Sequence, residues 1–198
     1  DRGEEATRME ASDAQLLGRT AAGDRSAFDE LVRRHQAVVF RFARAATRTP
    51  EQAEDVLQES FLAAFRSAAT YRGDAPVKSW LLAIARNKVH RLGRPRSGQP
   101  DHFEPLDVLG QRAGWGAEED PEAAAMDGQR RDRLAAALER LRTDDREILV
   151  LRDLEGLSGE ETADLLGIGL AAMKSRLHRA RLRFAAALRA GGGDPDGP

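Results

Sequence analysis

Apolar residues recur at helical spacing over most of the chain, and its N-terminal half predicts four helices. One pair lies between Asp13, which can cap the first helix, and Thr47, with a break at Gly23-Asp24. A third helix starts at Thr49-Pro50 and runs to about residue 70, because a capping threonine followed by proline suits a helix start. A fourth runs over 77–92 after a loop that holds Gly and Pro.

The third predicted helix has two different faces. Its core side carries Ala53, Val56, Leu57, Ser60, Phe61, Ala64 and Phe65, and its other side carries Asp55, Gln58, Glu59, Leu62 and Arg66. Leu62 among polar neighbours is either a partner contact or a scattered surface leucine, and spacing alone leaves both open. On the second helix, His35 has no Cys, Asp or second His nearby, so we expect a packed or half-exposed side chain rather than a metal ligand.

The C-terminal part of the chain predicts a second helical group. A helix is expected from Gln129 to Arg142, and another follows the cap 143–145, with Ile148, Leu149, Leu151 and Leu154 facing inward and Gly156 at its end. Ser158 and Glu161 then fit a capping box at the start of a short helix.

A tight turn and a basic helix follow that capping box. Gly167-Ile168-Gly169 supplies the turn, because glycine tolerates the backbone angles that a turn needs. The second helix buries Met173, Leu177, Ala180 and Phe184 on one stripe, and its other positions carry Lys174, Ser175, Arg176, His178, Arg179, Arg181 and Arg183. This pattern favours a helix-turn-helix for the major groove of DNA over a surface hairpin with solvated arginines.

The predicted fold class is therefore all-α: two small helical domains joined by a flexible acidic linker, the second with a helix-turn-helix. The boundaries are a disordered N-terminus at 1–12, domains at 13–96 and 129–190, a linker at 97–128 and a disordered tail at 191–198. The linker contains Leu106, Val108, Leu109 and Trp115, which either dock on a partner or are incidental in a tether.

Composition excludes several classes of protein. The 198 residues contain no cysteine, which rules out disulfides and thiolate metal sites, and we expect no metal and no cofactor. Paired catalytic carboxylates, a nucleophile with a histidine and a phosphate loop are not evident, so an enzyme has little support. No membrane-spanning run and no signal peptide are evident, so we expect a cytoplasmic protein that does not insert into membranes.

Charge is unevenly distributed behind a net charge of −2. Residues 16–96 carry 15 Lys/Arg against 8 Asp/Glu, residues 97–128 carry 1 against 8, and residues 129–190 carry 13 against 10. Two basic blocks separated by an acidic one predict two nucleic-acid-binding modules. In the first, Tyr71 and Trp80 precede basic residues, a combination that stacks unpaired bases and holds phosphates. Trp80 is at least partly a core residue, so Tyr71 is the better stacking candidate.

In this order, these features resemble a bacterial RNA polymerase sigma factor of the extracytoplasmic function (ECF) group, the minimal kind with two domains. The resemblance covers nearly everything from Leu16 to Ala190. Its N-terminal motifs are FDELVRRHQAVVFRFA, EQAEDVLQESFLAAFRS and YRGDAPVKSWLLAIARNKVHRLGR, and its C-terminal motif is LAAALERLRTDDREILVLRDLEGLSGEETADLLGIGLAAMKSRLHRARLRF. The ordered set is highly specific, whereas any single motif would not be.

The resemblance implies promoter-specific transcription initiation, with sigma region 2 in the first domain and region 4 in the second. The partners would be core RNA polymerase (its β′ clamp helices and β flap), promoter DNA and an anti-sigma factor. Core polymerase would bind Asp55, Gln58, Glu59, Phe61, Leu62 and Arg66. The opened minus-ten element would bind Tyr71, Arg72, Lys78, Trp80, Arg86, Asn87, Lys88, Arg91 and Arg94. The minus-thirty-five duplex would bind Lys174, Ser175, Arg176, His178, Arg179, Arg181 and Arg183. The acidic linker would thread toward the polymerase active-site and RNA-exit channel.

The start of the second helix departs from the family pattern, which usually opens with a small polar cap. Gly169 caps without a side-chain acceptor, and Leu170, Ala171 and Ala172 have no group that hydrogen-bonds a base. We therefore expect Lys174, Ser175, Arg176 and Arg179 to carry the sequence specificity. The competing hypothesis is a stand-alone helix-turn-helix regulator whose N-terminal helices dimerise or sense a signal.

Overall fold

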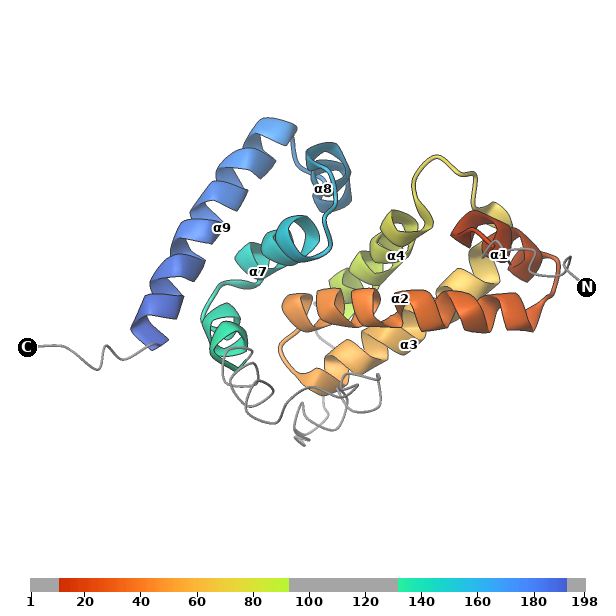
Figure 1. Ribbon diagram of the computed structural model, residues 1–198, viewed down its shortest axis with the longest axis horizontal. Helices are drawn as coiled ribbons and strands as arrows, with labels where there is room; N and C mark the ends of the chain where they lie inside the picture. Colours follow the sequence, from red (N-terminus) through yellow and green to blue (C-terminus); the bar gives the residue numbers. More distant parts are fainter. Residues whose placement is uncertain (1–10, 93–131, 192–198) are drawn as a thin grey trace, which may run out of the picture.

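The computed structural model describes residues 11–92 and 132–191, and every described element is helical. The N-terminal bundle consists of α1 (Asp13–Ala21), α2 (Arg25–Ala46), α3 (Pro50–Ser67), the 3-10 turn η1 (Ala68–Thr70) and α4 (Val77–Leu92). The C-terminal bundle consists of a helix over 132–139, α7 (Thr143–Leu149), the π-helical turn η2 (Val150–Leu154), α8 (Gly159–Leu166) and α9 (Leu170–Gly191). Figure 1 shows α9 on the far side of the C-terminal bundle from α2.

The helix starts confirm two of the predicted caps, at Thr49 and Ser158. Thr49 accepts a hydrogen bond from the backbone N–H of Gln52, and Ser158 forms the expected capping box with Glu161.

Two predicted caps were wrong. Ser12, not Asp13, caps α1. The carboxylate of Asp13 instead lies 2.6 Å from Nε2 of His35, a neighbour that the sequence did not indicate. His35 is buried, the first of its two predicted environments. Residues 143–145 lie inside α7, whose N-cap is Arg142 and whose start has no capping side chain.

Two apolar positions also differ from the prediction. Leu154 is 59% exposed, because the π-helical turn rotates the last residues of this segment away from the inward face. Phe65 is 39% exposed, although its ring still packs edge-to-face on Phe28 with centroids 5.0 Å apart. The predicted end at Gly156 is confirmed, since its φ of +67° reverses the chain there.

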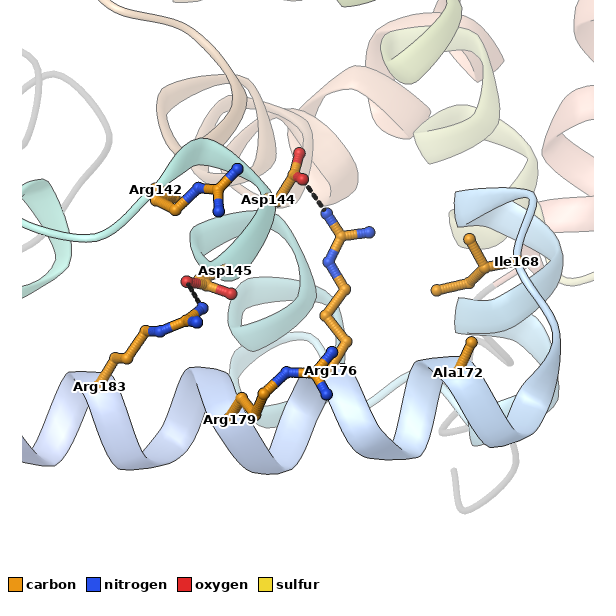
Figure 2. Close-up of a pocket in the computed structure, with 8 residues that line it drawn as sticks. All are labelled: Arg142, Asp144, Asp145, Ile168, Ala172, Arg176, Arg179 and Arg183. Atoms are coloured by element: carbon orange, nitrogen blue, oxygen red, sulfur yellow. Dashed lines mark hydrogen bonds and ion pairs between the residues drawn. The ribbon is translucent and has the colours of Figure 1, made fainter.

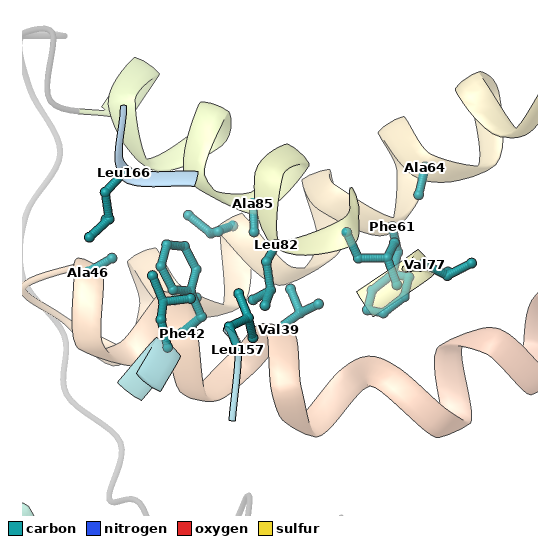
Figure 3. Close-up of a cluster of buried hydrophobic side chains, with 14 of the residues drawn as sticks. Val39, Phe42, Ala46, Phe61, Ala64, Val77, Leu82, Ala85, Leu157 and Leu166 are labelled. Carbon is teal, nitrogen blue, oxygen red and sulfur yellow. The ribbon is translucent and has the colours of Figure 1, made fainter. Parts of the chain in front are cut away.

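One hydrophobic core runs through both bundles. Leu157 and Leu166 of the C-terminal bundle lie in the same buried cluster as Val39, Phe42 and Leu82 of the N-terminal bundle, as Figure 3 shows. Each of these five side chains is at most 5% exposed. Burial of this apolar surface favours the association of the two bundles.

The predicted linker, Arg94, Arg96 and residues 1–10 and 192–198 of the two terminal segments lie outside the described residues. Disorder was wrongly predicted for Ser12, which caps α1, and for Gly191, which ends α9. Among the helices that the structure describes, none combines the length and apolar character that crossing a membrane requires.

Candidate nucleic-acid interface

The loop before α4 presents an aromatic pair. The rings of Tyr71 and Trp80 meet edge-to-face with centroids 5.5 Å apart, and both residues are half-buried. The Tyr71 hydroxyl donates a hydrogen bond of 2.6 Å to the carbonyl of Ala75, which holds the ring across the loop. Gly73 adopts a φ of +81°, which lets the loop turn tightly. Each ring therefore keeps only part of its surface available for stacking.

The predicted DNA-binding residues of this region differ in exposure. Arg72, Asn87 and Arg91 are exposed. Lys78 and Arg86 are half-buried, because their cationic groups donate to backbone carbonyls of the C-terminal bundle.

Lys88 is also engaged within the N-terminal bundle. Its ammonium pairs with the Glu59 carboxylate at 2.9 Å, and this hydrogen bond lowers the pKa of Glu59.

The face of α3 predicted to bind polymerase is exposed, with one exception. Asp55, Gln58 and Arg66 are open to solvent, and Leu62 is 44% exposed. Phe61 does not belong to this face: it is 7% exposed and packs against Phe28, with ring centroids 6.2 Å apart. Phe61 is thus a core residue, as helical spacing alone had predicted.

The helix-turn-helix forms as the sequence indicates. The chain leaves α8 through Gly167, whose φ of +66° is the left-handed value of a helix C-cap. Met173, Leu177 and Ala180 are buried beneath α9, and Phe184 is partly buried. The opposite surface of α9 is solvent-exposed.

Only part of the predicted basic surface of α9 is free. Three of its arginines are held by aspartates of the preceding segment: Arg176 by Asp144 at 2.6 Å, Arg181 by Asp153 at 2.5 Å and Arg183 by Asp145 at 2.7 Å. Lys174, Ser175, His178 and Arg179 are exposed, and within the described ranges they form no ion pair.

A pocket of about 320 Å³ lies between α9 and the start of α7. Figure 2 shows Arg176 and Arg183 reaching from α9 to Asp144 and Asp145, whereas the Arg179 side chain lies along α9 beside Arg176. Arg142 lines the pocket from the opposite side. Four guanidinium groups against two carboxylates give the pocket an excess of positive charge. Such a site suits an anion, and a phosphate matches the planar donor fork of arginine.

Sequence reasoning missed Arg142 as a member of this pocket. The spacing of 176, 179 and 183 does place three arginines along one edge of α9, next to its buried stripe. Nothing in the spacing says that residue 142 lies opposite that edge, because this depends on how α7 packs on α9.

Comparison with known proteins identifies two family models in the chain. Sigma-70 region 2 matches residues 31–97, and Sigma-70 region 4 matches residues 131–184. The ECF RNA polymerase sigma factor SigM of Mycobacterium tuberculosis is 40% identical over 178 residues, covering 90% of this chain and 85% of SigM.

Two solved structures of sigma factors are similar in fold to this chain. The structure of CnrH in complex with the cytosolic domain of CnrY has a TM-score of 0.61 at 28% identity, covering 91% of this chain and 99% of CnrH. RpoE of Bartonella quintana, solved with the anti-sigma factor NepR, has a TM-score of 0.59 at 21% identity, covering 82% of this chain and 96% of RpoE, and shares the fold. The chain belongs to the extracytoplasmic function family of RNA polymerase sigma factors.

Proposed function

We propose that three surfaces of this sigma factor have separate roles. In this proposal, α3 binds core polymerase, the loop 71–76 and α4 hold the opened minus-ten element, and α9 binds the minus-thirty-five duplex. The observation that carries this proposal is the presence of two separate basic, helix-borne surfaces in one chain that belongs to the sigma family. A stand-alone operator-binding protein needs only one of them.

The minus-ten assignment rests on the Tyr71 and Trp80 pair beside exposed cations. Extruding a base costs a few kcal/mol. Stacking on an aromatic ring returns about 1–3 kcal/mol per base, and arginine–phosphate contacts add to it. Arg72 and Arg91 are exposed for such contacts.

For the minus-thirty-five element, we propose that the exposed surface of α9 enters the major groove. Ser175 and Arg179 are polar and exposed there, so they are the candidates for contacts to base edges. Arg142 faces the same side across the pocket, and we propose that the pocket accepts a backbone phosphate. Arg176 and Arg183 would then position the pocket from their ion pairs with α7 rather than read bases.

Core polymerase is the proposed partner of the α3 face. Leu62 is the apolar centre of this surface, and Phe65 extends it by one helical turn. Asp55, Gln58 and Arg66 surround them with polar groups. This layout, an apolar centre within a polar rim, is typical of protein interfaces.

An anti-sigma partner is the proposed regulator. CnrH, which shares 28% sequence identity with this chain, is solved with the cytosolic domain of CnrY bound. We propose that this chain is controlled by an anti-sigma protein that binds both bundles.

In vitro transcription tests the proposed function. With core RNA polymerase and a supercoiled library of promoter fragments, the chain is expected to produce transcripts with discrete start sites, whereas alone it binds duplex DNA weakly. Tight binding to duplex DNA by a dimer without polymerase would instead support the stand-alone regulator.

A further inference from the structure

Lysine is rare in this chain, and each lysine lies on a surface proposed to bind DNA. The sequence contains 28 arginines but only three lysines, Lys78, Lys88 and Lys174. The two side chains share a positive charge but differ in chemistry. The amine of lysine can be acylated, whereas the guanidinium of arginine stays protonated and keeps its charge. The three lysines are therefore the side chains at which an acyl group would remove a charge from these surfaces.

Two of the three amines are held by other groups of the protein. Nζ of Lys78 donates to the carbonyl of Glu155 at 2.6 Å, and Lys78 is half-buried. Nζ of Lys88 lies 2.9 Å from the Glu59 carboxylate, and the Lys88 side chain is only 20% exposed. An amine must leave such a contact before it can attack an acyl donor, so both contacts slow acylation.

The amine of Lys174 is not held in this way. Lys174 is exposed on the second turn of α9, and among the described residues its amine has no hydrogen bond or ion pair. Helix α9 carries no acidic residue that could pair with it. On the preceding turn, Ala171 and Ala172 are exposed and small, so a donor can approach the amine from solvent.

His178 lies next to Lys174 on the same helix. The two residues are four positions apart, a spacing that makes them neighbours on a helix surface, and both are exposed. A neutral imidazole accepts a proton, and histidine is the side chain that most often serves as a general base. The Lys174 ammonium can therefore pass a proton to His178 and become a nucleophilic amine.

The charge of α9 favours an anionic acyl donor. The helix carries Lys174 and five arginines, and Arg179 is exposed near Lys174 and His178. A surface with one sign of charge raises the local concentration of ions of the opposite sign. An acyl phosphate is both an activated acyl group and an anion, so it suits this surface.

We propose that Lys174 is an acylation site at which a small acyl phosphate removes a positive charge from α9, with His178 as the general base. One ammonium proton passes to His178 and then to water. Nζ attacks the carbonyl carbon of the donor, a C–N bond forms, the C–O bond to phosphate breaks, and the phosphate leaves with the second proton that the nitrogen loses.

The product of this reaction is a neutral amide, so α9 loses one positive charge and one potential phosphate contact. Binding of the minus-thirty-five duplex is therefore weakened. This consequence rests on the proposed function of α9, whereas the selective reactivity of Lys174 does not.

Acylation kinetics test the site directly. The full-length chain is incubated with acetyl phosphate, and acetylation of the three lysines is followed over time by peptide mass spectrometry. In the folded chain, Lys174 is expected to react about tenfold faster than Lys78 and Lys88, because its amine has no contact to break. In urea, where the tertiary contacts are lost, the three rates are expected to converge. Equal rates in the folded chain, or the same ranking in urea, would overturn the proposal.

His178→Gln tests the general base, because glutamine is polar but does not take up the proton. The rate at Lys174 is expected to fall severalfold in this variant, with unchanged rates at Lys78 and Lys88. H90Q is the matched control, since His90 is exposed on α4 and the same change there is expected to leave the rate at Lys174 unchanged. An unchanged rate in H178Q would refute the role of His178.

Transcription with core polymerase tests the consequence of the modification. The chain is acetylated and freed of the donor before core polymerase is added, and each protein is compared with its own untreated sample. K174R is the matched control, because it retains Lys78 and Lys88 but has no amine at position 174. Treatment is expected to lower the promoter-specific transcript of the wild type about three- to tenfold, through loss of one cationic contact, and to lower that of K174R much less. An equal loss in both proteins would overturn the regulatory role of Lys174.

The same experiments separate this inference from the function on which it rests. If the untreated wild type gives no promoter-specific transcript, the proposed function fails whatever the mass spectra show. If the untreated wild type transcribes and Lys174 does not react first, only the acylation site fails.

Discussion

Leu157→Ala is expected to destabilise both bundles, because Leu157 lies in the core that they share. The residue follows Gly156 at the entrance to the helix-turn-helix and is 2% exposed. Figure 3 shows its side chain among residues of α2 and α4, with Phe42 and Val39 nearby. The substitution removes this apolar contact and leaves a cavity where the two bundles meet.

The magnitude follows from the burial of the side chain. Replacing a fully buried leucine by alanine costs about 2–5 kcal/mol, which combines lost transfer energy and the cavity. We expect about 3 kcal/mol, since packing from both sides limits collapse around the cavity. With a urea m-value of about 2 kcal/mol/M, the unfolding midpoint would fall by about 1.5 M.

Urea unfolding measures the total change, and amide hydrogen exchange locates it. Protection is expected to fall in α2 and α4 as well as in α8 and α9. Leu182→Ala is the matched control: it makes the same chemical change on α9, where Leu182 is 59% exposed, and is expected to alter stability by less than about 0.5 kcal/mol.

Two results would refute this reasoning. A loss of stability below about 1 kcal/mol would mean that Leu157 is not packed between the bundles. A loss confined to α8 and α9, with unchanged exchange in α2 and α4, would mean that the two bundles have independent cores.

Four further predictions concern the individual surfaces. Leu62→Asp is expected to weaken core-polymerase binding at least about tenfold, because a charge replaces the apolar centre of the α3 face. The far-UV circular dichroism spectrum is expected to stay unchanged, and unaltered affinity would argue that this face does not bind core polymerase. Arg142→Gln is expected to lower the slope of log K against log salt for promoter duplex by about 1, equally across sequences, and a sequence-dependent loss would argue against a phosphate contact. Burial raises the pKa of Glu147, so its folded form loses stability as pH rises above the ordinary value of 4.5; Glu147→Gln is therefore expected to raise Tm at pH 7 but not below about pH 4, and a pH-independent difference would contradict this. Ser158→Ala is expected to cost about 1 kcal/mol in urea unfolding through loss of the capping box, and a neutral result would show that the box does not stabilise α8.

The periodicity of apolar residues predicted the helices well. The predicted bounds of α4 at residues 77 and 92 are confirmed, as are the cap at Thr49, the capping box at Ser158 and the break at Gly167. These features depend on residues within about four positions of one another, so a single sequence contains the relevant information.

The same spacing did not predict how the charged residues pair. Arg176, Arg181 and Arg183, which the resemblance assigns to DNA binding, each pair with an aspartate on the segment before α8, and spacing along α9 does not indicate these pairs. Phe61 was assigned to the polymerase-binding face by resemblance, although helical spacing had placed it in the core and the structure buries it. A helical wheel shows which residues share a face but not what that face meets.

The sequence by itself determined an all-α chain with two basic helical groups and a helix-turn-helix, because backbone hydrogen bonding and capping act locally. Only the tertiary structure decided which basic side chains remain free and that the two bundles share one core. The ion pair between Arg41 and Glu155 joins residues 114 positions apart, and the contact of Lys78 with the Glu155 carbonyl spans 77. Such contacts arise from the packing of whole helices, in which burial of apolar surface selects the faces that meet and so decides which charges they bring together.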